Sequence, residues 1–150
     1  MQPSELRDQW NETVAAVELL GPVTNKLAAE RSSQEWEGSW TTRAEIGRGS
    51  TAELLVTTFE WSISSTAAEA STEVECTITA PGLEQLDARV LEALSMTIAA
   101  PALIPVARAH LLDMVLRLGL PAPGLGLIKL PSIQQVLEGK TPPAPAGAPH

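Results

Sequence analysis

AELLVTTFEWSIS, residues 52–64, is the stretch that decides the fold. Every second residue from Leu55 to Ile63 is apolar or β-branched, which is the two-residue period of a strand with one buried face. The stretch holds the only phenylalanine, Phe59, and one of four tryptophans, Trp61, in a chain without tyrosine. Since burying a large apolar side chain contributes roughly 1.5–3 kcal/mol, we expect the core to centre on this strand.

Two further stretches show the same alternation. Residues 36–46 and residues 72–80 alternate apolar with polar side chains, as antiparallel strands do when one face is in water. Residues 47–50 read GRGS and form a natural turn into the central strand. The sequence therefore predicts strands over residues 36–46, 52–64 and 72–80.

Residues 83–98 fit two structures. Helical spacing runs through Leu83, Leu86, Val90 and Leu94. The alternation of a strand runs through Val90, Leu94, Met96 and Ile98. We favour a turn followed by a fourth strand over residues 90–98, and a continuous helix is the alternative.

Helices are expected before and after the strands in the chain. A helix begins at Glu5, ends before Gly21-Pro22, and is followed by a second short helix over residues 23–28. The apolar face of the first helix is formed by Leu6, Trp10, Val14 and Val17. Another helix is expected over residues 105–118, with Gly119 as its C-terminal cap.

Together these elements predict an α+β fold, with N-terminal helices, a four-stranded antiparallel meander and a C-terminal helix packed on the sheet. Residues 1–119 are expected to form this single domain. Residues 120–140 are rich in proline and glycine, and we interpret them as a docking segment with a short helix capped by Ser132 and Gln135. Residues 141–150 are expected to be disordered.

Composition excludes some classes of partner and suggests a compartment. The net charge of −8 argues against nucleic acid, because a phosphate backbone requires a basic face. Cys76 is the only cysteine, so no internal disulfide can form, which fits a reducing compartment. The charged N-terminus resembles no targeting leader, and the apolar run over residues 94–107 is too short to span a bilayer. We therefore expect an intracellular, cytoplasmic protein with no transmembrane segment.

Catalytic chemistry is not indicated. His110 lies in an apolar helix without a second metal ligand at a suitable spacing, and Cys76 lies on an inner strand face, where thiols are inert. Glu60, Glu73 and Glu75 lie on the solvated faces of strands. We expect no enzyme activity, no catalytic residue, no cofactor and no metal.

A family resemblance is carried by two short motifs. Phe59-Glu60-Trp61-Ser62 and Ala80-Pro81-Gly82-Leu83 resemble motifs in the N-terminal domain of activators of the heat-shock protein 90 ATPase. The resemblance covers about residues 36–118, and Leu103-Ile104-Pro105 with the following helix is similar to the closing helix of that family. It implies a chaperone-cofactor domain that binds another protein.

The chain departs from that family at its chaperone-contacting motifs. The Asn-x-x-Asn-Trp-His-Trp segment is absent, because Trp36 and Trp40 are too far apart to form it. Of the basic turn of the family, only Arg48 has a counterpart here. The resemblance therefore implies the fold more than the activity.

Three functions remain open. The first is a non-enzymatic protein-binding module resembling a chaperone ATPase-activator domain. The second is a carrier of a small apolar ligand or lipid, lined by Trp36, Trp40 and Trp61, although core packing is the favoured role of these rings. The third is a structural subunit of a larger assembly. The expected partner is therefore another protein, either a chaperone or a component of a larger complex.

The candidate partner-binding residues lie mostly in the docking segment, where apolar side chains are dense and two of the three lysines of the chain are found. They are Arg48, Leu127, Ile128, Lys129, Leu130, Ile133, Val136 and Leu137. We expect residues 125–138 to order against a partner or against the surface of the domain itself.

Overall fold

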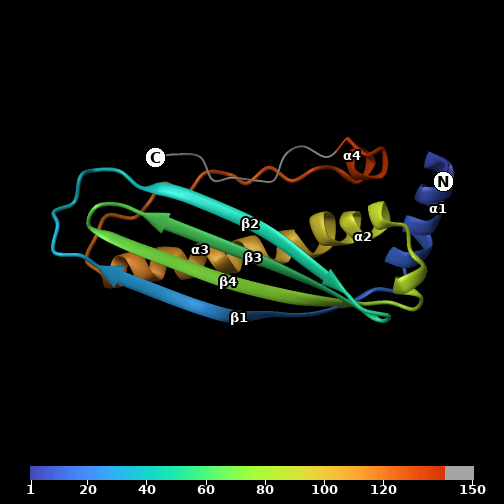
Figure 1. Cartoon of the computed structure of the whole chain (residues 1–150), viewed down its shortest axis with the longest axis horizontal. Coiled ribbons are helices and arrows are strands. Elements are labelled where there is room, and N and C mark those ends of the chain that lie inside the picture. The colour runs from blue at the N-terminus through green and yellow to red at the C-terminus, as the bar shows by residue number, and fades with distance from the viewer. Residues whose placement is uncertain (141–150) are drawn as a thin grey trace.

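A computed structural model describes residues 1–140, which form four strands and several helices around one core (Figure 1). In chain order the elements are α1 (Pro3–Val14), β1 (Glu18–Arg31), β2 (Thr41–Ser50), β3 (Leu54–Ser64), β4 (Ala68–Thr79), the 3-10 turn η1 (Leu83–Gln85), α2 (Ala88–Leu94), the π-helical turn η2 (Ser95–Ala99), α3 (Ala100–Arg117) and α4 (Ile133–Leu137). The prediction of disorder for residues 141–150 lies outside the described residues.

The four strands form one antiparallel sheet in the order β1-β4-β3-β2. Consecutive hairpins join β2, β3 and β4, and β1 adds to the free side of β4. Helix α3 lies across one face of the sheet and contacts β3 and β4, while the other face is open (Figure 1). The predicted α+β class is confirmed.

The core centres on β3, as its alternation predicts. Buried and half-buried side chains alternate from Leu55 to Ser64, and Phe59 and Trp61 are both 0% exposed. The two rings lie 5.6 Å apart, and Phe59 opposes Val74 on β4. The buried face of the sheet and the inward face of α3 therefore fill a single interior.

The predicted start of β2 and its turn are wrong. The strand begins at Thr41 rather than at residue 36, because Gly38 has a φ of +93° that an extended strand does not allow. Trp36 and Trp40 instead pack against each other with ring centroids 4.8 Å apart. The hairpin closes at Thr51, whose N–H donates to Leu54 O, rather than within residues 47–50.

The predicted second N-terminal helix is also wrong, because residues 23–28 belong to the strand β1. The strand pairs with β4 through register shifts between Leu20 and Val23 and between Thr24 and Lys26. Gly21, with a φ of +106°, lies in the first of these irregularities. The shifts remove the two-residue period from this stretch of sequence. The four-residue spacing of Val23 and Leu27 therefore suggests a helix where the structure has a strand.

The predicted fourth strand over residues 90–98 is wrong, and the helical alternative is correct. Residues 88–117 form one continuous helical run of α2, η2 and α3, in which Val90 and Leu94 are fully buried. The run therefore begins far before the predicted residue 105. Gly119 ends it as predicted: its N–H bonds to Leu116 O, and that of Leu120 bonds to Val115 O.

The helical run is apolar beyond what its buried face requires. Its most apolar 18-residue window has a mean hydropathy of 1.8, and 44% of that window is buried. By length and composition alone the run could cross a membrane, which is weak evidence because the core helix of a globular domain passes the same test. Here the run packs on the sheet.

The chain after α3 returns along the molecule to α4 (Figure 1). We call residues 120–131 the strap. Helix α4 packs on α2 and α1, and Val136 and Leu137 join the core there with 0% and 4% exposure. The predicted capping box is present, since Ser132 Oγ accepts from the N–H of Gln135 and the Gln135 side chain accepts from the N–H of Ser132.

Candidate functional site

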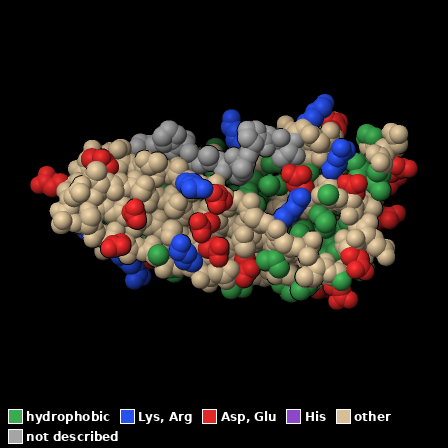
Figure 2. All heavy atoms as spheres, viewed as in Figure 1, with side chains coloured by type: hydrophobic (Ala, Val, Ile, Leu, Met, Phe, Trp, Pro, Cys, Tyr) green, Lys and Arg blue, Asp and Glu red, His purple; other side chains and the backbone are tan. Residues whose placement is uncertain are grey.

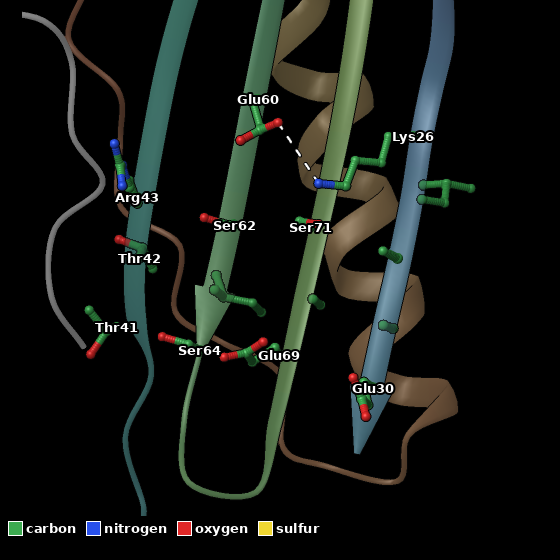
Figure 3. Close-up of a pocket in the computed structure, with 15 residues that line it drawn as sticks. Lys26, Glu30, Thr41, Thr42, Arg43, Glu60, Ser62, Ser64, Glu69 and Ser71 are labelled. Carbon is green, nitrogen blue, oxygen red and sulfur yellow. Dashed lines mark ion pairs between the residues drawn. The ribbon is translucent and has the colours of Figure 1, made fainter. Parts of the chain in front are cut away.

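The strap lies on the helix side of the sheet, along the seam between α3 and β2 (Figures 1 and 3). It enters next to Trp40, the residue before β2, and its middle reaches Arg108 on α3. Residues 120–131 form no helix or strand. The seam therefore holds a length of polypeptide outside regular secondary structure.

Two side chains hold the strap by its main chain. The Arg108 guanidinium donates to Leu125 O at 2.9 Å and to Gly126 O at 3.2 Å, and the Trp40 Nε1–H donates to Pro121 O at 3.3 Å. Arg108 also lies over the Trp61 ring, 5.1 Å from its centroid. Because these donors contact carbonyl oxygens, which every residue has, these hydrogen bonds do not depend on the side chains of the bound segment.

The side chains of the strap alternate between the core and solvent. Pro123 is buried, and Leu125 and Ile128 are half-buried against the core. Leu127 is 87% exposed, and Lys129 is also exposed. A few apolar anchors and the main-chain contacts therefore position the strap.

The predicted partner-binding residues divide into two groups. Val136 and Leu137 are buried in the core beside α2, so they attach the segment to the domain. Leu127, Ile128, Lys129, Leu130 and Ile133 are exposed or half-buried on the strap and α4, and Arg48 is exposed on β2. Within the predicted docking segment, residues 125–131 therefore lie along the domain, and α4 contributes Val136 and Leu137 to the core.

The outer face of the sheet is hollowed and polar. A depression of about 730 Å³ lies over all four strands and is lined by hydroxyl and charged side chains (Figure 3). Glu45, Glu60, Glu73 and Lys26 follow one another across the sheet, and Lys26 Nζ lies 4.0 Å from Glu60 Oε2. Figure 2 shows acidic and basic side chains close together over the middle of this face.

This outer face has the character of a solvated surface. Within residues 1–140 no group of three or more His, Cys, Asp or Glu side chains is placed to hold a metal ion. Glu60 lies in the open depression, where water screens its charge from its neighbours. The outer face therefore offers exposed polar and charged contacts.

Cys76 and His110 have structural positions. The Cys76 thiol is 1% exposed beneath α3, and burial, with a smaller effect of Glu75, raises its pKa to about 11. The thiol is therefore neutral at pH 7 and is a poor nucleophile. His110 Nε2 and Thr24 Oγ1 lie 2.8 Å apart and link α3 to β1.

Sequence reasoning missed the two side chains that hold the strap. Arg108 is the only charged residue between positions 94 and 112, and this isolation in an apolar stretch was the available signal. The alternation of residues 36–46 places Trp40 on a strand face and gives no sign of the bond that its indole N–H donates to Pro121 O. Their role depends on the strap folding back, which no local pattern reveals.

Comparisons with known proteins identify the fold. No family model matches the sequence, and a search of curated proteins gives no match. Among solved structures, the chain is similar to the SecB-like chaperone Rv1957 of Mycobacterium tuberculosis, solved in complex with a ChAD peptide from the Rv1956 HigA1 antitoxin. The TM-score is 0.66 at 17% identity, covering 85% of this chain and 98% of that chain.

A protein of unknown function from Streptococcus agalactiae is also 17% identical, over 74% of this chain and 97% of that chain, but its TM-score of 0.42 is too low to indicate a shared fold. The fold of this chain is therefore one also found in a SecB-like chaperone. The resemblance to heat-shock protein 90 activators is corrected accordingly: a chaperone-related fold is supported, and that particular domain is not.

Proposed function

We propose that the protein is a non-enzymatic module that binds other polypeptides in an extended conformation, as a chaperone does, and that it works in the cytoplasm. The observation that carries the proposal is the strap, which occupies the seam through contacts to main-chain oxygens at Pro121, Leu125 and Gly126. A seam that holds one extended segment in this way offers the same donors to another. The shared fold with a SecB-like chaperone supports this proposal.

The strap is then an internal occupant that a client polypeptide displaces. The strap is tied at both ends, by Leu120 after α3 and by α4, so its middle can lift while the domain stays folded. A client can bind only those molecules in which the seam is free. The strap therefore raises the apparent Kd for a client in inverse proportion to the fraction of such molecules. We further propose that the exposed residues of the docking segment, with Leu127 and Lys129 foremost, contact the bound partner together with Arg48.

The carrier function finds no supporting observation. The side chains between the sheet and α3 fill the interior, and the hollows found on residues 1–140 lie on the outer face and at the ends of the sheet. Trp61 is one of the three rings that would line a ligand cavity. It is 0% exposed and belongs to the packed core. A protein partner is therefore the ligand class that we propose.

The test is binding of a fluorescein-labelled, permanently unfolded polypeptide, such as a reduced and carboxymethylated protein, measured by anisotropy. We expect binding of the unfolded form and none of its native form. Leu125→Ser removes a strap anchor without changing the seam donors, so it should tighten binding several-fold. Leu127→Ser is the matched control, because an 87% exposed side chain does not anchor the strap.

The control separates two roles of the segment. Unchanged affinity in Leu127→Ser leaves the seam as the main contact, and weaker affinity assigns Leu127 to the client interface. If neither the wild type nor Leu125→Ser binds the unfolded polypeptide at about 100 μM, a Kd scale at which binding would contribute only some 5 kcal/mol, the proposed function is wrong.

A further inference from the structure

Two tryptophans lie where the strap begins. The loop between β1 and β2 is at the same end of the molecule as the start of the strap (Figure 1). Within that loop Gly38, with a φ of +93°, turns the chain between Trp36 and Trp40, whose ring centroids lie 4.8 Å apart. Trp40 is 3% exposed, and Trp36 is half-buried. The two rings form a small aromatic surface, which we call the tryptophan pair.

The hairpin between β3 and β4 holds this loop on both sides of Trp36. The Thr66 N–H donates to Glu37 Oε1 at 2.8 Å, and the Thr66 hydroxyl donates to Glu35 O at 3.0 Å. The Ser32 hydroxyl donates to Thr66 O at 2.6 Å. A surface that is held in place before its ligand arrives loses less conformational entropy on binding. The loop therefore presents the tryptophan pair in a fixed position.

The strap meets the tryptophan pair at a proline. It begins Leu120-Pro121-Ala122-Pro123, and the Trp40 Nε1–H donates to Pro121 O at 3.3 Å. Two residues further along, Pro123 is buried. Because proline has no backbone N–H, its burial outside a helix or strand leaves no backbone donor without a partner. A segment with prolines at these two positions therefore enters the seam at a lower desolvation cost than one without them.

Proline also prepares the segment for the seam. The proline ring fixes φ, and the residue before a proline is driven to extended conformations, so a Pro-x-Pro segment is already extended when it is free. Grooves lined by aromatic rings bind proline-rich segments for this reason. A tryptophan contributes an apolar ring and an N–H that bonds to a carbonyl oxygen of the segment. The contact between Trp40 and Pro121 has both parts.

We propose that the tryptophan pair is a recognition site for proline, and that a client polypeptide places a Pro-x-Pro sequence there in the positions of Pro121 and Pro123. The inference rests on the proposed function and adds the class of client sequence that one end of the seam selects. Arg108 contacts carbonyl oxygens in the middle of the strap, whatever side chains they carry. Selection among clients therefore takes place at the tryptophan pair.

The experiment compares two fluorescein-labelled peptides by anisotropy, on the full chain with Leu125→Ser to loosen the strap. One peptide has the sequence of residues 120–131, and the other has alanine at the two positions that correspond to Pro121 and Pro123. The strap competes equally with both peptides, so the ratio of their Kd values reports the recognition of proline alone. The proline peptide should bind about five- to tenfold more tightly, as expected from the chain entropy that two prolines remove.

Trp40→Leu in the same background should bring the ratio of the two Kd values close to one. Trp10→Leu is the matched control, because Trp10 is a buried ring on α1, and it should keep the ratio. Should Trp40→Leu fail to fold, the indole N–H signals in NMR spectra of the folded Leu125→Ser protein decide the question. The Trp40 signal should move when the proline peptide is added, and the Trp10 signal should not.

Equal Kd values for the two peptides, a preference that persists in folded Trp40→Leu, or an unmoved Trp40 signal would overturn the inference. The unfolded polypeptide of the preceding test separates this result from the proposed function. If that polypeptide binds while the two peptides bind equally, the seam holds clients without selecting proline. If the proline peptide is preferred while the unfolded polypeptide does not bind, the proline site stands and the general binding of clients is wrong.

Discussion

The two edges of the sheet meet the helix layer in opposite ways. At the β2 edge the strap covers the seam with α3, and Arg108 and Trp40 bond to its carbonyls. At the β1 edge no segment of residues 1–140 covers the strand, and leucines are exposed on both the strand and α3. The same fold therefore has one edge closed by its own chain and one edge that residues 1–140 leave uncovered.

The difference places most of the buried side chains away from the β1 edge. Buried residues concentrate on β3, β4, α3 and α4, whereas every side chain of β1 is exposed. Changes near the covered edge should therefore alter the free energy of unfolding strongly. Changes at the open edge should leave the free energy of unfolding nearly unchanged.

The largest effect is expected for Trp61→Ala, beneath Arg108 at the covered side. Trp61 is fully buried, so its loss should lower the free energy of unfolding by about 3–5 kcal/mol, as for other large-to-small core changes. Glu60→Ala, on the outer face of the same strand, should change it by about 0.5 kcal/mol or less. Urea melts of the two variants measure the difference, and equal losses would contradict the assigned faces.

The second prediction compares two leucines of the docking segment. Leu137 is 4% exposed and Leu127 is 87% exposed. Leu137→Ala should therefore destabilise the domain by about 2–5 kcal/mol, and Leu127→Ala by almost nothing. Thermal melting of both variants checks this. Similar small effects would mean that α4 contributes nothing to the fold and that residues 125–138 need an external partner to order.

Local patterns in the sequence predict the parts of this molecule whose structure is local. The strict alternation of β3, the glycine cap at Gly119 and the capping box at Ser132 are each found within a few residues, and each is present. Strand β1 has no such pattern, because pairing with β4 through two register shifts makes it a strand. Tertiary pairing overrides local spacing there.

The strand over residues 90–98 was favoured over the helical alternative for a different reason. Val90, Leu94 and their neighbours are apolar on more than one side, so helical and strand periods fit equally well. The seam could not be predicted from local patterns, because Arg108 bonds to carbonyl oxygens 17 and 18 residues further along the chain. Of the candidate site, the sequence could indicate the docking segment and could not indicate what holds it.

The third prediction concerns the donors at the covered edge. Arg108→Ala removes two charged hydrogen bonds to the strap and the contact with Trp61, so we expect a loss of about 1.5–3 kcal/mol. Arg117→Ala is the control on the same helix, because its ion pair with Asp113 is exposed and worth about 0.3–0.5 kcal/mol. Hydrogen exchange should also accelerate in residues 121–128 of the first variant only. Unchanged exchange there would show that the apolar anchors alone hold the strap.

The smallest effect is expected at the open edge. Lys26 is the one cation in the row with Glu45, Glu60 and Glu73, and its ammonium group lies 4.0 Å from Glu60. Lys26→Ala leaves three carboxylates in adjacent positions, where like charges are unfavourable. Both partners of the ion pair are more than two-fifths exposed, however, so the loss should be only about 0–1 kcal/mol.

Because water and salt screen exposed charges, the loss in Lys26→Ala should disappear in 1 M salt, where the Debye length falls to about 3 Å. Urea melts of Lys26→Ala and of the wild type at low and high salt measure the loss. A loss above about 2 kcal/mol, or one that salt does not reduce, would mean that β1 is held to the sheet by more than its backbone ladder and these weak charges.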